Sequence, residues 1–220
     1  MFDIQMVFDT YIASLVSEVE VAKKDLETYA ESLEEQVALR TRQLESLSRE
    51  DALTGLNNQR TFYEILRHEM AVSERHQEEL SLIYFDLNGF KKVNDTKGHI
   101  IGDDVLKNVG IAIQNGIRDT DHGCRYGGDE FVIILPRTDL DMAKGVMDRV
   151  TASFRENESR GVSFSAGITS VGPLSFCSMD ELVREADQLM YAAKEKSRKK
   201  SGFYVVSKAS KQASIELVNK

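Results

Sequence analysis

The sequence predicts an α+β domain of βαββαβ topology that follows a long helix. Three observations predict this fold class. The first fifty residues contain neither glycine nor proline, and their apolar residues recur with helical spacing. From Asp51 onward, short strand-like apolar runs alternate with helical patterns. Between Gly123 and Leu135 the chain reads GCRYGGDEFVIIL, in which Gly-Gly is typical of the tight turn of a hairpin that joins two strands directly.

The N-terminal segment, residues 1–50, has the 4,3 apolar spacing of a coiled coil over about five heptads. A single helix with so narrow an apolar stripe would find its partner in another copy, so we expect a parallel homodimer. The alternative is a helix packed along the globular domain. Lys23 and Arg40 occupy two seam positions, where polar residues specify register. The apolar seam consists of Ile12, Val16, Val19, Leu26, Ala30, Leu33, Val37, Leu44 and Leu47.

The elements after Asp51 follow in a definite order. DALTGLNN ends the long helix in a structured turn. We then expect a helix near 61–78, a strand over 80–87 and a helix through VLKNVGIAIQNGI after Gly102. The hairpin strands lie near 122–126 and 131–136, and are followed by a helix near 139–155, a strand over 162–171, a helix over 179–196 and the strand FYVVS. This order predicts a ferredoxin-like sheet with its helices on one face.

Composition argues against several classes of protein. Residues 1–50 hold 11 acidic and 5 basic residues, which accounts for most of the net charge of −8. Neither part has the basic surface of a nucleic-acid-binding protein. No run approaches the ~18–20 apolar residues of a membrane span, and MFDIQMVF lacks the basic start of a secretory signal. Cys124 and Cys177 have no paired spacing, so we expect reduced thiols and a cytoplasmic protein.

Acidic residues at the hairpin indicate a metal site. Asp129 and Glu130 lead from the turn into the apolar run FVIIL. In the predicted topology the end of the first strand lies beside this hairpin, so Asp86 should arrive next to them. Carboxylates on adjacent strands, together with the Leu87 carbonyl, form a hard oxygen site suited to Mg²⁺. Two divalent ions there can activate a hydroxyl and stabilise a leaving pyrophosphate. Each acid taken alone fits a solvated strand end equally well.

Basic residues in two segments can bind phosphate. Lys91 and Lys92 follow the first strand, although a solvated lysine pair is the commoner meaning of such a dipeptide. Lys194 and Arg198 are four residues apart and share one face of the last helix. They either hold phosphates or complement the C-terminal end of that helix.

Two polar residues between these segments can recognise guanine. The amide of Asn94 can pair with O6 or N7, and the carboxylate of Asp103 can accept from N1–H and the 2-amino group. The run Gly102-Asp103-Asp104 also looks like a helix N-terminus, where acidic residues match the helix dipole. Asp103 can serve both purposes.

Four segments together resemble the GGDEF family of diguanylate cyclases: DALTGLNN, FDLNGFKKVNDTKGHIIGDDVL, RYGGDEF and YAAKEKSR. They stand in the family's order and spacing over about residues 49–207. The resemblance implies a nucleotidyl-cyclase and polymerase-palm-like catalytic domain over 51–208, between the helix of residues 1–50 and a C-terminal tail over 209–220. It also implies condensation of two GTP into cyclic di-GMP, with one half-site on each of two facing domains.

The resemblance implies roles for residues at the matching positions. Asp86, the Leu87 carbonyl, Asp129 and Glu130 would hold Mg²⁺ or Mn²⁺, two ions per GTP half-site. The implied catalytic residues are Asp129, which is also the base for the attacking 3′-hydroxyl, Glu130 and Lys91. The implied substrate-binding residues are Phe90, Lys91, Asn94, His99, Asp103, Gly127, Gly128, Lys194 and Arg198.

A second site is implied by Arg118-Asp119-Thr120-Asp121, just before the hairpin. In the GGDEF family this Arg-x-x-Asp pattern binds the product, with arginine on phosphate and on guanine. Arg118 and Asp121, assisted by Arg149, would therefore give product inhibition. The pattern also occurs by chance.

Other functions stay open at this point. The main alternative is a catalytically silent receptor for cyclic di-GMP or GTP that signals through its coiled coil. A cyclase that makes a mixed GMP–AMP product is a second alternative, against which Asp103 argues. A coiled-coil scaffold with a passive globular part is the third.

Overall fold

The computed structural model describes residues 20, 23–24, 26–30, 32–34, 36–37, 49–157, 161–173, 175–198, 202–209 and 212–217. The chain divides into two compact units, Met1–Ser48 and Arg49–Lys220. Among the described residues, no helix combines the length and the apolar character needed to cross a membrane.

The described residues of the first unit are helical, as the heptad pattern predicts. Four of the predicted apolar seam residues lie among them, and all four are exposed: Leu26 is 67% exposed, Leu33 42% and Val37 63%, and Ala30 is exposed as well. The seam residues Ile12, Val16, Val19, Leu44 and Leu47, and Arg40, lie outside the described residues. The predicted coiled-coil dimer therefore stays a prediction.

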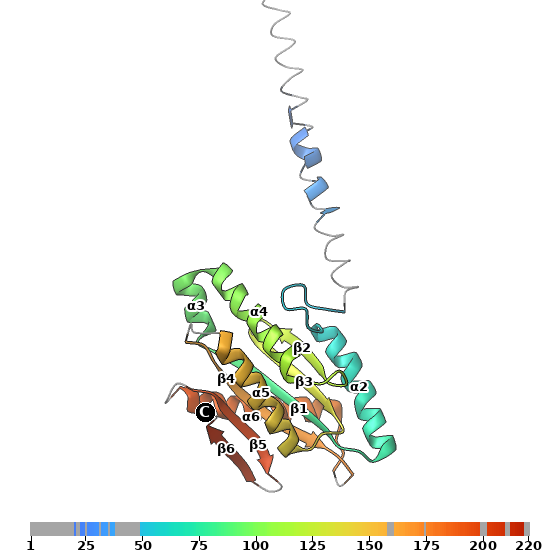
Figure 1. Cartoon of the computed structure of the whole chain (residues 1–220). Coiled ribbons are helices and arrows are strands. Elements are labelled where there is room, and N and C mark those ends of the chain that lie inside the picture. Colours follow the sequence, from blue (N-terminus) through green and yellow to red (C-terminus); the bar gives the residue numbers. More distant parts are fainter. Residues whose placement is uncertain are drawn as a thin grey trace, which may run out of the picture. The chain divides into compact units, whose positions relative to one another are not determined.

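The second unit is built on one six-stranded sheet, with strand order β2-β3-β1-β4-β5-β6 (Figure 1). Strand β1 lies inside the sheet and pairs antiparallel with both β3 and β4, while β4 and β5 are parallel. The first four strands have the predicted ferredoxin-like arrangement. The strand bounds are β1 Leu80–Asn88, β2 His122–Gly127, β3 Glu130–Pro136, β4 Ser163–Val171, β5 Tyr204–Ala209 and β6 Gln212–Leu217.

Helices cover both faces of the sheet, so the expectation that all of them lie on one face is wrong. Helices α4 and α5 pack on the face that carries Ile83 and Phe85 of β1. Helices α2 and α6 pack on the opposite face, against Leu82 and Tyr84. The physical reason is that both faces of β1 carry large apolar side chains, and the strand is buried at every position before Asn88, so both of its faces need a cover. The helix bounds are α2 Gln59–His76, α3 Phe90–Lys97, α4 His99–Gly116, α5 Leu140–Asn157 and α6 Met179–Ser197.

Capping residues fix where α2 and α6 begin, and a glycine sets how closely α6 packs on the sheet. Asn58 caps α2, because its side chain accepts from the Thr61 N–H at 3.0 Å. Ser178 and Glu181 form a capping box at the start of α6. Gly167 of β4 then lets α6 lie directly on the sheet, since a Cβ there would be 2.1 Å from the Ala186 carbonyl oxygen.

Three expectations differ from the structure. The short helix α3 was not predicted, because its eight residues are mostly polar and show no clear apolar stripe. Gly102-Asp103-Asp104 does not begin a helix: α4 starts earlier, at His99, and Asp103 lies within it. Part of the expected C-terminal tail over 209–220 forms β6, which pairs with β5.

Candidate functional site

The end of β1 carries Asp86, a carboxylate that is 5% exposed. In the sheet Asp86 lies opposite Glu130 of β3 and Ser165 of β4, so the predicted meeting of β1 with the hairpin is confirmed. The Oδ2 atom of Asp86 accepts a hydrogen bond from the Nζ atom of Lys194, on α6, at 2.7 Å. Its Oδ1 atom is buried and has no hydrogen-bond partner within the part of the chain that the structure describes. Burial raises the pKa of Asp86, while Lys194 acts to lower it. Because this unpartnered oxygen is buried, a cation would bind there favourably.

Glu130 lies beside Asp86 in register, yet its carboxylate is bonded elsewhere. The Tyr84 hydroxyl donates to its Oε2 atom at 3.1 Å. Burial raises the pKa of Glu130, and the hydrogen bond from Tyr84 acts to lower it. Across the described ranges, no three acidic, histidine or cysteine side chains form a group that would hold a metal ion. The predicted metal ligands Asp86, Leu87, Asp129 and Glu130 nevertheless lie at the same end of β1, and their oxygen atoms are of the hard kind that Mg²⁺ prefers.

The hairpin turn brings Asp129 to the end of β1. The Leu87 N–H donates to the Asp129 carbonyl at 3.2 Å. Gly128 has φ +51°, the left-handed region that favours glycine. A Cβ added at Gly127 or Gly128 would meet nothing within 4 Å, so the outer side of the turn is open. This openness suits the close approach of a ligand to the backbone.

A network that the sequence did not reveal holds this turn. The Arg125 guanidinium donates from Nη1 to both carboxylate oxygens of Asp51, each at 3.1 Å. It also donates from Nε and Nη2 to the Gly128 carbonyl, at 3.1 and 2.8 Å. Asp51 in turn accepts from the N–H and the hydroxyl of Thr54, at 2.9 and 2.7 Å. Although burial acts to raise the pKa of Asp51, the bonds from Thr54 and Arg125 outweigh it and lower that pKa. The segment DALT is therefore tied to the turn that precedes Asp129.

A cavity of about 460 Å³ opens beside the ends of β1 and α6. Four of its lining side chains are cationic and one is a carboxylate, a balance that suits a polyphosphate. Six predicted site residues line it: Leu87, Phe90, Lys91, Asp129, Lys194 and Arg198. Arg198 also pairs with Glu195 on its own helix. Sequence reasoning did not assign the lining residues Asn88, Gly161, Ser163 and Ser197, because such small polar residues carry no distinctive motif.

The predicted guanine-binding residues lie next to one another, at the junction of α3 and α4. The Asn94 Oδ1 atom is buried and has no hydrogen-bond partner among the described residues. It lies against Gly102, where an added Cβ would be only 1.9 Å away. Asp103, the next residue of α4, and His99, its first residue, are both exposed. These three polar residues do not line the phosphate-suited cavity, although Phe90 lines it and lies close to Gly102 as well.

The residues of the predicted inhibitory site lie in a different loop, between α4 and β2. The Arg118 N–H donates to the Asp121 Oδ2 atom at 2.9 Å, and Asp121 is buried. The Arg118 side chain is exposed. Arg149, on α5, donates to the Gly116 carbonyl at 2.9 and 3.1 Å, two residues before Arg118. The structure therefore brings Arg149 to this loop.

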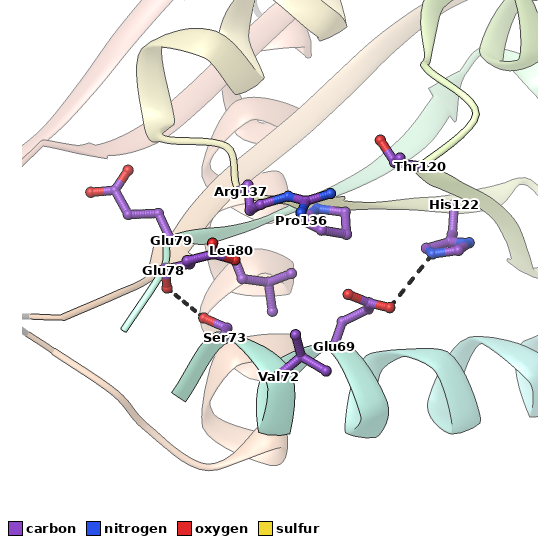
Figure 2. A pocket seen from close by; sticks show the side chains of 10 residues that line it. All are labelled: Glu69, Val72, Ser73, Glu78, Glu79, Leu80, Thr120, His122, Pro136 and Arg137. Carbon is purple, nitrogen blue, oxygen red and sulfur yellow. Dashed lines mark hydrogen bonds and ion pairs between the residues drawn. The ribbon is translucent and has the colours of Figure 1, made fainter. Parts of the chain in front are cut away.

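A second cavity, of about 290 Å³, lies at the opposite end of β1 (Figure 2). Leu80, the first residue of β1, lines it, whereas Leu87 and Asn88 of the same strand line the other cavity. Figure 2 shows Glu69 of α2 facing His122 of β2, with 3.9 Å between Oε1 and Nε2. None of the predicted catalytic or substrate-binding residues lines this second cavity.

The fold and the site define a class: a palm-like α+β domain in which the first strand and a hairpin present carboxylates beside a cationic cavity. Residues 48–200 match the family described as "Diguanylate cyclase, GGDEF domain". The chain belongs to the GGDEF family.

Individual proteins agree with this assignment. The chain is 37% identical over 151 residues to the diguanylate cyclase DgcS of Shewanella oneidensis. The aligned region covers 67% of this chain and 50% of DgcS. The part of this chain that matches spans half or less of the length of these curated relatives. The crystal structure of the diguanylate cyclase SiaD of Pseudomonas aeruginosa, in complex with its activator SiaC, has a TM-score of 0.66 and 31% identity, covering 93% of this chain and 80% of SiaD. The coiled coil and GGDEF domain of DgcB from Caulobacter crescentus, in complex with c-di-GMP, has a TM-score of 0.65 and 25% identity, covering 83% of this chain and 99% of that one.

Proposed function

We propose that this chain is a diguanylate cyclase, which condenses two GTP into cyclic di-GMP and releases two pyrophosphates. The observation that carries the proposal is the buried Asp86 carboxylate, with its unpartnered oxygen, next to the cationic cavity. Membership of the GGDEF family supports it. We place the activity in the cytoplasm, where reduced thiols such as the buried Cys124 are expected.

In the proposed reaction, the chain's own residues position charge. Lys91, Lys194 and Arg198 bind the triphosphate, and Lys194 leaves Asp86 to do so. Asp129 accepts the proton of the 3′-hydroxyl, which attacks the α-phosphorus of the facing GTP in line and expels pyrophosphate. Positioning and electrostatic stabilisation supply most of the rate enhancement of such a nucleotidyl transfer.

Asp86, Asp129 and the Leu87 carbonyl would hold Mg²⁺ or Mn²⁺, proposed as two ions per half-site with Glu130 in support. The ions would activate the hydroxyl and neutralise the leaving group.

Guanine recognition is assigned to the junction of α3 and α4. Asn94 supplies an amide group next to Gly102, and Asp103 supplies an exposed carboxylate. Guanine offers O6 or N7 to the Asn94 amide, and N1–H and its 2-amino group to the Asp103 carboxylate. Adenine lacks O6, the N1–H and the 2-amino group, so it would leave polar groups of the site without hydrogen bonds, and guanine is selected over adenine. Phe90 and His99 flank the nucleotide in this assignment.

Each domain carries half of the reacting groups, so the proposed enzyme is a homodimer. The exposed apolar side chains of Leu26, Leu33 and Val37 support dimerisation through the N-terminal helix. Such a coiled coil raises the effective concentration of the two domains and can hold them in a productive or unproductive register.

Feedback by the product is part of the proposal. The exposed Arg118 guanidinium would bind a phosphate and a guanine edge of cyclic di-GMP, with Asp121 and Arg149 completing the site. Support comes from the contact between Arg149 and Gly116, which brings a second guanidinium to the same loop.

The test is to incubate the purified protein with GTP and Mg²⁺ and to resolve the products by mass. We expect cyclic di-GMP from the wild type and none from Asp129→Ala. The exposed Asp141, on α5, provides the matched control Asp141→Ala, which should match the wild type. Absence of product from a protein shown to be dimeric would contradict the cyclase proposal, and binding of cyclic di-GMP by that protein would favour the receptor.

Feedback is tested in the same reactions. Arg118→Ala should let product accumulate further than in the wild type, whereas Arg60→Ala, an exposed arginine on α2, should not. Equal accumulation in the wild type and Arg118→Ala would contradict the inhibitory site.

A further inference from the structure

The face of β1 and β4 that meets the end of α6 is polar, in contrast to the apolar packing farther along that face. Asn88, the last residue of β1, is the centre of this polar cluster. Its amide group donates to the Ser163 hydroxyl at 3.2 Å. Its Oδ1 atom accepts from the Ser165 hydroxyl and from the Ser197 hydroxyl, each at 3.0 Å. Asn88 therefore joins β1, β4 and the last turn of α6.

The turn that Asn88 contacts is the one that carries two cations of the cavity. The Ser197 hydroxyl also lies 3.0 Å from the Lys194 carbonyl oxygen, and the Arg198 N–H donates to that same carbonyl at 3.1 Å. Lys194, Ser197 and Arg198 thus belong to one hydrogen-bonded turn, and all three line the cavity. Whatever fixes Ser197 also fixes the backbone from which the two cations extend.

Two side-chain contacts connect this turn to β1. Lys194 bonds to Asp86, and Ser197 bonds to Asn88, two residues farther along the strand. In the proposed reaction Lys194 leaves Asp86 to bind the triphosphate, and the first contact is then lost. The contact between Ser197 and Asn88 does not involve a charged group and can persist.

We propose that Asn88 is a positioning residue for phosphate binding, acting through Ser197 to hold the last turn of α6 while Lys194 moves from Asp86 to the triphosphate. This inference rests on the proposed function for the identity of the ligand. Asn88 need not touch the ligand for this role, because it acts through the turn that carries Lys194 and Arg198.

The experiment measures binding of 3′-deoxy-GTP with Mg²⁺ by calorimetry, since this nucleotide lacks the attacking hydroxyl and cannot react. We expect Asn88→Ala to weaken binding about fivefold to tenfold, the loss typical of one or two neutral hydrogen bonds. Ser197→Ala should weaken it similarly, and the double variant should be little worse than either single one, because the two residues act as one unit. Ser197→Thr, which keeps the hydroxyl, should bind like the wild type.

The matched control is Ser81→Ala, which removes a buried serine hydroxyl at the other end of β1. That hydroxyl donates to the Thr138 carbonyl at 2.7 Å. Thermal unfolding of every variant shows whether the chain is folded at the temperature of the titration. Ser81→Ala should lower the unfolding temperature without changing binding, which separates positioning from general stability.

The outcomes distinguish the two levels of the proposal. If the wild type does not bind 3′-deoxy-GTP, the proposed substrate is wrong, and the role of Asn88 falls with it. If the wild type binds but Asn88→Ala and Ser197→Ala bind equally well while folded, the positioning role alone is wrong. Weakening by Ser197→Thr as large as by Ser197→Ala would also contradict it.

Discussion

Removing Arg125 should both destabilise the second unit and disturb the turn that carries Asp129. The Arg125 guanidinium makes two hydrogen bonds to Asp51 and two to the Gly128 carbonyl. The side chains of Arg125 and Asp51 are only 15% and 23% exposed, so water screens this pair weakly. An exposed ion pair contributes at most about 1 kcal/mol, and breaking a buried one costs about 3–5 kcal/mol. For this half-buried network we expect Arg125→Ala to lower the free energy of unfolding by about 2–3 kcal/mol.

A double-mutant cycle isolates the part that belongs to the pair. Urea unfolding at pH 7 of the wild type, Asp51→Ala, Arg125→Ala and the double variant should give a coupling of about 1–2 kcal/mol. The coupling is smaller than either single effect, because each residue also bonds to a third group. Arg125→Lys should restore less than half of the loss, since an ammonium group cannot bond to Asp51 and Gly128 as the planar fork does.

The exposed pair of Arg60 and Glu64 on α2 is the control for this cycle. Their side chains are 65% and 46% exposed, and the same cycle there should give no more than about 0.5 kcal/mol. Because the pKa of Asp51 is lowered in the folded chain, its contribution is present above its unfolded pKa of about 4 and is lost as the pH falls through the folded value. An Asp51–Arg125 coupling no larger than that of the control pair would refute the reasoning, as would full cyclase activity of Arg125→Ala.

Three further perturbations test other parts of the structure. Gly128→Ala should destabilise the chain by about 1 kcal/mol in urea unfolding, because φ is +51° there, whereas Gly127→Ala should not; equal effects would contradict the assigned turn. Asp86→Asn should make no product and should unfold at a higher temperature than the wild type at pH 7. Burial raises the pKa of Asp86, so the charged carboxylate opposes folding above that pKa. A lower unfolding temperature for the variant would contradict this reasoning. Leu33→Asp should shift the protein to monomer in analytical ultracentrifugation and lower its activity most at low protein concentration; an unchanged dimer would place the interface elsewhere.

The parts of the site that follow from strand pairing were predictable from the sequence. A hairpin signalled by Gly-Gly and a strand ending in Asp86 suffice to bring that carboxylate to Glu130, because sheet topology leaves few alternatives. The contacts of Lys194 with Asp86 and of Arg125 with Asp51 were not predictable. They join residues 108 and 74 positions apart, and they depend on how α6 and the DALT turn dock.

The direction of a side chain within the site was also hidden from the sequence. Glu130 has a carboxylate suited to a metal, and in the structure it accepts from the hydroxyl of Tyr84, which lies on the face that meets α2 and α6. The placement of α6 on that face depends on Gly167, where any side chain would collide with the helix backbone. The sequence predicted a helix over 179–196, but not which face of the sheet this helix covers.

The central claim is that the cavity at the end of β1 condenses GTP, and the stoichiometry of the products tests it most directly. The wild-type protein would be incubated with GTP and Mg²⁺, and pyrophosphate, phosphate and nucleotides would be quantified over time. We expect two pyrophosphates for each cyclic di-GMP formed and no free phosphate. Release of phosphate with GDP would indicate a hydrolase, and no consumption of GTP by the dimeric protein would contradict the claim.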